Sequence, residues 1–405
     1  MAHRKTTKLV GALAGVSALL ASAACSTTQP TSNASETSGP LKVGLLVPLT
    51  GSLAEPGSWI QEGVKYGVQQ VNAAGGVNHR KIQLVTVDTA GDPTQAVTGV
   101  NKLINQDQVQ FIIGPITSDA MTAVLPVENQ HDIASIPVVG STELTPQKMP
   151  YGFSMLLNAA DQSQAMVNYA KSRGYTRVAI LHDNGEQGLS ANTALKADAA
   201  KAGLTVTGNQ QYTVGDTNVS AQVLSLKRGN PQAVLLFPTD GTDVGHVLQA
   251  MKSLGWNVPV IGGYGAHYST QIAQVSGPSS MSNLTATVYA PFGACPGKAA
   301  PAATTKYIKA IKAFDPKAFP TLALDLAAAS TDSVSIMKQG MEGAGSTSGK
   351  KYASWMNQHA GSISGLVNPS VSASSSSHFL FGPSDMVLVN PGKQVSTGVY
   401  ERTDC

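Results

Sequence analysis

The sequence predicts an α/β protein with two Rossmann-like lobes, each built around a parallel sheet. Short runs rich in Val, Ile and Leu alternate with stretches of helical period along most of the 405 residues. Strands that alternate with helices indicate parallel sheets. The alternation occurs in two successive series, and the chain is long enough for two domains of ordinary size, so we expect two lobes.

The first 24 residues have the features of a secretion signal. Arg4, Lys5 and Lys8 form a basic start, residues 9–20 form an apolar run, and small residues at 22–24 supply a cleavage site. The apolar run is shorter than the roughly 20 residues that a membrane-spanning helix needs. We therefore expect residues 1–24 to be a signal peptide and the mature protein to be extracytoplasmic.

Cys25 follows the cleavage site directly, which resembles a bacterial lipobox, although Ser22 stands where that pattern has an aliphatic residue. The next residues are rich in Ser, Thr, Gly and Pro, the composition of a flexible linker. We expect a tether over residues 25–40 and lipidation of Cys25, which would anchor the protein to the bacterial cell membrane. Secretion of a soluble protein with a free Cys25 is the alternative.

Two further cysteines, Cys295 and Cys405, remain if Cys25 is acylated. An even pair in an oxidising compartment predicts a disulfide, with two free thiols as the alternative. No His/Cys cluster has the spacing of a metal site, so we expect no metal and no cofactor.

The charge of the chain gives no sign of a charged partner. Only 13% of the residues are charged, against roughly 25% in an average soluble protein. Removing the three basic residues of the signal leaves 24 basic residues against 24 acidic ones. Nucleic-acid binding, which needs a basic stripe, is not expected.

Periodicity and turn residues place the elements of the first series. Asp92-Pro93 predicts a helix start, with Asp as the N-cap and Pro as the first helical residue. Pro126 is expected to kink or end the helix that begins near Thr117. Strands are expected at 41–48, 82–87, 110–113 and 134–139, and a further helix at 58–71.

The second series has the same alternation, and the last third of the chain is less regular. Strands are expected at 177–181, 233–237 and 258–261, with helices at 189–202 and in the stretch that ends at Gly255. In the last third we expect helices at 305–314 and 322–337, a loop at 374–377, and a hairpin of 379–381 with 386–389.

The turn after the strand at 110–113 is a candidate ligand site. Thr117 and Ser118 open the next helix, where hydroxyl groups serve as caps and backbone N–H groups attract anions. Ligands of open α/β sheets bind outside the carboxyl ends of the strands. An ordinary helix cap is the alternative. Asp119 in the first turn would oppose a bound carboxylate if it faced the ligand.

Several short segments stand in the order that is typical of one family. They are Pro48-Leu49-Thr50-Gly51, Asn72 to Val77, Gly91 to Ala96, Ile113-Gly114-Pro115 and Glu143-Leu144-Thr145. From about Leu41 to the C-terminus the chain resembles the substrate-binding proteins of branched-chain amino-acid ABC transporters.

The resemblance implies the periplasmic binding protein type I fold. Its two lobes are joined by three hinge crossovers and close on a ligand by hinge bending. The expected boundaries are 41–157 plus 292–378 for lobe 1, and 158–291 plus 379–405 for lobe 2.

The resemblance also assigns candidate ligand-binding residues. In lobe 1, Thr117 and Ser118 match the position that holds the ligand carboxylate, and Ser141 and Thr142 match a second ligand contact. In lobe 2, Tyr264 stands where amino-acid binders carry the Glu that pairs with the ammonium group. Either Asp240 supplies that charge, or the ligand has no ammonium group. Two further candidates are Gln187, where relatives often have Tyr, and Trp59, which stacks on the ligand or lies in the core.

We therefore expect a monomeric solute-binding protein, not an enzyme. It would capture a small polar ligand, such as an amino acid or a related amide or carboxylate, and deliver it to the membrane subunits of an ABC permease. A lipoprotein that senses a ligand without transport is the alternative. A secreted hydrolase is less favoured because no G-x-S-x-G, H-E-x-x-H or P-loop motif is present and no catalytic residue is assigned.

Overall fold

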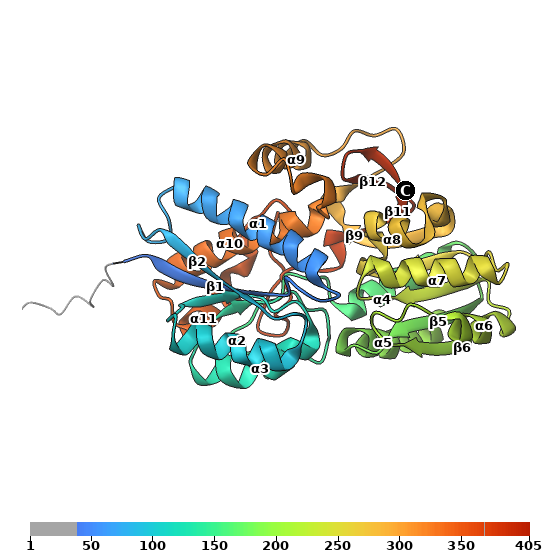
Figure 1. The fold of residues 1–405 in the computed structure, drawn as a ribbon, viewed down its shortest axis with the longest axis horizontal. Coiled ribbons are helices and arrows are strands. Elements are labelled where there is room, and N and C mark those ends of the chain that lie inside the picture. Colours follow the sequence, from blue (N-terminus) through green and yellow to red (C-terminus); the bar gives the residue numbers. More distant parts are fainter. Residues whose placement is uncertain (1–38, 368) are drawn as a thin grey trace, which may run out of the picture. The chain divides into compact units, whose positions relative to one another are not determined.

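The computed structural model describes residues 39–367 and 369–405, which form two α/β lobes (Figure 1). The predicted signal peptide, Cys25 and all of the tether except Gly39 and Pro40 lie outside the described residues. None of the helices in the described part combines the length and the apolar character that crossing a bilayer requires.

The first lobe is built on a four-stranded parallel sheet. The strand order is β2-β1-β3-β4, so the central strands are β1 and β3, whose apolar residues are fully buried. Asp92 caps α2 as predicted, since its carboxylate accepts a hydrogen bond from the Gln95 N–H at 2.8 Å. The elements are β1 (Leu41–Val47), α1 (Ala54–Ala73), β2 (Ile82–Asp88), α2 (Pro93–Asn105), β3 (Phe111–Ile113), α3 (Ser118–Gln130) and β4 (Ser135–Ile136).

The second lobe is built on an eight-stranded sheet with the order β10-β12-β11-β9-β8-β7-β5-β6. Strands β5 to β9 are parallel, as predicted, but β11 runs antiparallel to β9. The elements are α4 (Ala159–Ser172), β5 (Arg177–Asp183), α5 (Glu186–Ala202), β6 (Thr205–Tyr212), α6 (Ser220–Arg228), β7 (Ala233–Phe237), α7 (Gly241–Ser253), β8 (Val260–Gly262), α8 (Ser269–Ser276), β9 (Leu284–Tyr289), β10 (Gly293–Ala294), β11 (Met386–Ser396) and β12 (Val399–Arg402).

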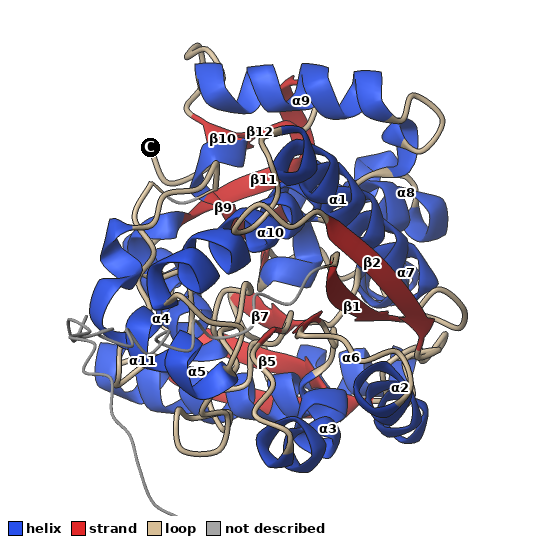
Figure 2. Cartoon of the chain, turned by 90° about the vertical axis from the view of Figure 1, so that its left-hand side faces the viewer, coloured by secondary structure: helices blue, strands red, loops and turns tan. Residues whose placement is uncertain are grey.

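Three helices from the last third of the chain complete the first lobe (Figure 2). They are α9 (Ala302–Phe314), α10 (Leu324–Ala344) and α11 (Gly349–His359). Helix α10 lies against α1 at Gly63, where an added Cβ would come within 2.2 Å of the Ala327 carbonyl oxygen. On α11, the Tyr352 ring meets the Phe111 ring of β3 edge-on at 5.3 Å. The core of the first lobe is therefore closed by residues more than 200 positions from β1.

Short 3-10 segments connect several of these elements. They are η1 (Tyr264–His267), η2 (Pro278–Asn283), η3 (Ala290–Phe292), η4 (Phe319–Thr321), η5 (Ala360–Ser362) and η6 (Pro383–Asp385).

The chain passes between the two sheets three times, after β4, after β10 and before β11, as the resemblance implies. The first and third passages are hydrogen-bonded, because Ser154 N–H donates to the His378 carbonyl and Leu380 N–H donates to the Ser154 carbonyl, both at 2.8 Å. The Tyr289 hydroxyl, at the end of β9, donates to the Met155 carbonyl. These bonds hold the first and third crossovers together and connect the first crossover to the end of β9. The residue at which each lobe begins stays a prediction.

Two expectations about local structure need correction. Helix α3 does not end at Pro126 but continues to Gln130, and the alternative of a kink stays a prediction. Pro126 and Thr122 are exposed, so water can satisfy the Thr122 carbonyl, which lacks its helical donor because proline has no N–H. The terminal hairpin pairs β11 with β12, whereas Phe379 forms a bridge to Ser154 in the crossovers.

A disulfide joins Cys295 and Cys405, the pair that the sequence predicts, with 5.9 Å between their Cα atoms. It links the last residue of the chain to the segment after β10. Because β10 pairs with β12, the bond lies at the β10 edge of the second sheet.

Candidate functional site

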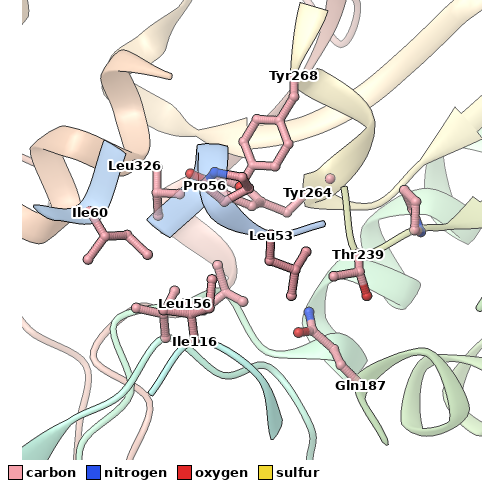
Figure 3. Close-up of a pocket in the computed structure, with 13 residues that line it drawn as sticks. Leu53, Pro56, Ile60, Ile116, Leu156, Gln187, Thr239, Tyr264, Tyr268 and Leu326 are labelled. Atoms are coloured by element: carbon pink, nitrogen blue, oxygen red, sulfur yellow. The ribbon is translucent and has the colours of Figure 1, made fainter. Parts of the chain in front are cut away.

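A cavity lies between the lobes, where β3, β4, β7 and β8 end (Figure 3). About 500 Å³ of non-atom space, with open solvent included, lies between its lining residues. Both lobes contribute to it, as expected for a ligand site at the carboxyl edges of α/β sheets. The lining residues are Leu53, Pro56, Ile60, Ile116, Val138, Leu156 and Leu326 from the first lobe, and Gln187, Pro238, Thr239, Tyr264, Gly265 and Tyr268 from the second.

The lining is mainly apolar. No charged residue is among the residues that line this cavity, and eight of the thirteen are Leu, Ile, Val or Pro. Figure 3 shows Tyr268 reaching from the upper side towards Pro56, with Gln187 on the other side of Leu53 in this view. The cavity wall thus differs from the polar site that the sequence predicts.

Tyr264 links the lobes through a buried carboxylate. Its hydroxyl donates to Asp325 Oδ2 at 2.7 Å, and His267 Nε2 lies 3.0 Å from Asp325 Oδ1. Tyr264 and His267 belong to η1, whereas Asp325 lies in the first turn of α10. The Nδ1 atom of His267 faces the Tyr264 carbonyl oxygen, and its Nε2 atom faces Asp325. Both oxygens of Asp325 are thereby engaged.

The hydroxyl groups of the turn that was predicted to hold a ligand carboxylate accept hydrogen bonds from backbone N–H groups of the chain. Thr117 caps α3, because its hydroxyl accepts from the Ala120 N–H at 3.2 Å. The Ser118 hydroxyl accepts from the Ser141 N–H at 3.3 Å. The backbone approaches closely here, since an added Cβ on Gly114 would lie 2.1 Å from the Leu46 carbonyl oxygen. Neither hydroxyl group lines the cavity.

Helix α5 of the second lobe contacts this turn. The Glu186 carboxylate accepts hydrogen bonds from Ser141 at 3.1 Å and from Thr122 at 2.8 Å. The Thr142 hydroxyl lies 2.7 Å from the Ser190 hydroxyl. The Glu186 N–H donates to Asp119 at 3.2 Å. We call this set the α5 contact, formed by Asp119, Thr122, Ser141, Thr142, Glu186 and Ser190.

Two other candidates, Trp59 and Asp240, lie outside the cavity wall. Trp59 is 1% exposed and meets the Tyr268 ring edge-on at 4.9 Å, as in a core aromatic residue. Asp240 caps α7, because its Oδ1 accepts from the Asp243 N–H at 3.1 Å and from the Thr242 hydroxyl. Of the eight predicted ligand residues, the structure places Gln187 and Tyr264 at the cavity and the other six away from it.

Burial shifts the pKa of several groups near the cavity. It raises the pKa of Asp183 to about 7, against hydrogen bonds from Thr239 and Gly185 that lower it. Burial also raises the pKa of Tyr264 and Tyr268 well above the usual value. Both tyrosines are therefore protonated and uncharged at neutral pH. Among the described residues, no group of three His, Cys, Asp or Glu side chains could hold a metal ion.

His182 and Asp183 do not form an acid–base pair of the kind that hydrolases use. His182 Nδ1 faces the backbone carbonyl of Asp183 at 2.7 Å, and the Asp183 carboxylate accepts from Thr239 at 2.8 Å. Neither residue lines the cavity.

Some of the lining residues carried a signal in the sequence and some did not. Ile116 and Thr239 lie shortly after predicted strands and Val138 lies near the end of one, so their place at the carboxyl edge could have been inferred. Leu326 could not, because it reaches the cavity only through the packing of α10 against α1.

The two α/β lobes are joined by three crossovers, and both contribute to the cavity. This arrangement is that of a two-lobed ligand-binding protein. The chain belongs to the periplasmic binding protein family, whose model matches residues 40–393.

The relatives agree with this assignment. The chain is 28% identical over 309 residues to the Leu/Ile/Val-binding protein homolog 3 of Brucella melitensis, which covers 76% of this chain and 80% of the relative. A branched-chain amino acid transporter substrate-binding protein from Streptococcus pneumoniae, solved with isoleucine, has a TM-score of 0.74 at 19% identity, covering 87% of this chain and 97% of that one. A solute-binding protein of an ABC transporter from Rhodopseudomonas palustris, solved with 4-hydroxybenzoate, has a TM-score of 0.78 at 16% identity, covering 90% and 96%.

Proposed function

We propose that the protein captures a small solute in the interlobe cavity and delivers it to an ABC permease. The observation that carries the proposal is the cavity itself, which is lined from both lobes, so that a ligand there would hold the lobes together. Such pockets bury most of the ligand and fix its orientation with a few polar groups. The relative named for Leu/Ile/Val binding and the structure named as the solute-binding protein of an ABC transporter support the same role.

Binding and delivery can be tested separately. Purified protein is screened against solutes by calorimetry, with the expectation of one ligand per chain, no chemical change in the ligand, and a smaller radius of gyration on binding. The protein is then added to membrane vesicles that contain a candidate permease and its ATPase. Ligand-dependent stimulation of ATP hydrolysis supports transport. Binding with closure but without stimulation supports the sensing role, and turnover of the ligand would show an enzyme.

We further propose that the protein acts as a monomer tethered to the membrane through lipidated Cys25. A small-residue site directly before Cys25 and the linker composition after it support the proposal. Cys25→Ala should release the protein from the membrane fraction without changing ligand affinity. A soluble wild-type protein in cell fractionation would instead indicate plain secretion.

A further inference from the structure

The chemistry of the cavity wall restricts the class of ligand. A ligand with a buried charge needs an opposite charge or several hydrogen bonds, because desolvation of an unpaired charge is strongly unfavourable. The wall has no charged side chain, and its polar side chains are those of Gln187, Thr239, Tyr264 and Tyr268. A charged ligand would therefore need a partner among the groups that lie near the wall.

The nearby carboxylates are engaged with the protein. Asp325, next to the lining residue Leu326, uses one oxygen for the Tyr264 hydroxyl and the other for His267. Asp183 accepts from Thr239 at 2.8 Å and from the Gly185 N–H at 3.0 Å. Neither carboxylate is among the residues that line the cavity, so a ligand ammonium group in the cavity would not meet either of them directly.

The cavity wall does not include the hydroxyl groups expected to contact the ligand in the first lobe, those of Thr117, Ser118, Ser141 and Thr142. Ser141 donates to the Glu186 carboxylate, and Thr142 pairs with Ser190. The negative charge of Glu186 would repel a ligand carboxylate brought to Ser141.

Two polar side chains on the wall remain free for a ligand. The Tyr268 hydroxyl has no hydrogen-bond partner in the part of the chain that the structure describes, although Tyr268 is only 6% exposed. The Gln187 amide likewise has no partner there and packs against Gly140. The phenol of Tyr268 is uncharged, because burial raises its pKa. Both groups suit a neutral hydroxyl or carbonyl group.

We infer that the cavity takes a small, uncharged, mainly apolar compound whose hydroxyl or carbonyl group hydrogen-bonds to Tyr268. The apolar body of the compound would lie against Leu53, Ile60, Ile116 and Leu326. The inference rests on the proposed solute-binding function and narrows it, since it excludes free amino acids as the preferred ligand.

Two sets of compounds that share an apolar group and differ in their polar, charged or uncharged end test this inference. One set comprises 3-methylbutan-1-ol, 3-methylbutanoate, 3-methylbutylamine and leucine, and the second comprises benzyl alcohol, benzoate, benzylamine and phenylalanine. In calorimetry with the mature protein, we expect one of the alcohols to bind at least about tenfold more tightly than each charged member of its set. Tighter binding of a charged member, or no binding of either alcohol at millimolar concentration, would overturn the inference.

A pair of Tyr→Phe variants tests the assigned hydroxyl. Tyr268→Phe should weaken binding of the alcohol about fivefold to tenfold and leave binding of the matching hydrocarbon unchanged. Tyr400→Phe is the control, because the Tyr400 hydroxyl lies 3.5 Å from the Ser269 hydroxyl and Tyr400 does not line the cavity. Equal alcohol affinities for Tyr268→Phe and wild type would remove Tyr268 from the site.

The outcomes separate this inference from the proposed function. A charged compound that binds one to one and stimulates a permease refutes the inference and leaves the function intact. An alcohol that binds with the expected preference but stimulates no permease supports the ligand class and argues against transport.

Discussion

The buried Asp325 network gives a prediction that needs no ligand. Asp325 is 1% exposed and receives the Tyr264 hydroxyl at 2.7 Å and His267 Nε2 at 3.0 Å, both from the other lobe. Asp325→Asn keeps the shape of the side chain but turns an NH₂ group towards one of these donors. Hydrogen bonds to a charged group contribute about 1.5–3 kcal/mol each. Breaking a buried pair by changing one partner costs about 3–5 kcal/mol.

Thermal unfolding measures this loss. A chain of this size has an unfolding entropy on the order of 0.8 kcal/mol per kelvin, so the loss corresponds to a Tm lower by about 4–6 °C. A Tm within about 1 °C of wild type would refute the reasoning, because that shift corresponds to less than about 1 kcal/mol.

Asp332→Asn is the matched control. Asp332 is also buried on α10, but it accepts from the Leu366 and Val367 N–H groups of its own lobe, at 2.9 and 2.8 Å. Both variants should melt earlier than wild type. Only Asp325→Asn should also change the distance between fluorophores placed on α2 and α6. Equal changes in that distance would show that Asp325 does not couple the lobes.

Three further predictions concern the closed arrangement, the pH dependence and the disulfide. Glu186→Ala removes two hydrogen bonds of the half-buried α5 contact, so it should favour separation of the lobes by roughly 1–2 kcal/mol. Small-angle scattering should detect the separated lobes, and unchanged scattering curves would contradict this prediction. Burial raises the pKa of Glu128 from 4.5 to about 8, so its contribution to stability is complete below pH 4.5 and is lost as the pH rises towards 8. Glu128→Gln should therefore gain a few kcal/mol relative to wild type between pH 5 and pH 8 in urea unfolding, and parallel pH profiles would refute the shift. Replacing Cys295 and Cys405 by Ser opens a loop that spans 110 positions and should lower the free energy of unfolding by about 4–5 kcal/mol; wild type in reducing agent should match the double variant, and a reductant-insensitive wild type would argue against the bond.

The main features of the fold could be predicted because they depend on local patterns. Apolar runs such as Ala233–Phe237 are found as buried strands, and Asp92-Pro93 begins a helix. Strand β6, by contrast, has the mixed sequence TVTGNQQY and half-buried residues at an edge of the sheet, so it shows no clear apolar period. Helix α11 is polar except on the face that carries Tyr352 and Met356, and it is not among the helices that the sequence predicts.

The candidate site was less predictable, because it depends on how distant segments meet. Ser118 and Ser141 have the residue type and position of ligand donors, but no local pattern shows that Glu186 reaches Ser141 from the other lobe. Leu326 and Tyr268 likewise reach the cavity only once α10 and η1 face each other. Hydroxyl groups at strand ends indicated the edge of each sheet at which the cavity lies. They did not show which polar atoms at that edge are free of hydrogen bonds within the protein.

The bonded crossovers limit the ways in which the lobes can move. Ser154 is bonded to His378 and Leu380, and Met155 is bonded to Tyr289, so the first and third crossovers resist sliding along each other. A separation of the lobes would have to bend or twist these bonded segments together, which would leave few degrees of freedom. A hinge motion restricted in this way would bring α5 back to the same hydroxyl groups each time the lobes close. Short side chains such as Ser190 and Thr142 would then re-form their hydrogen bond in the same geometry.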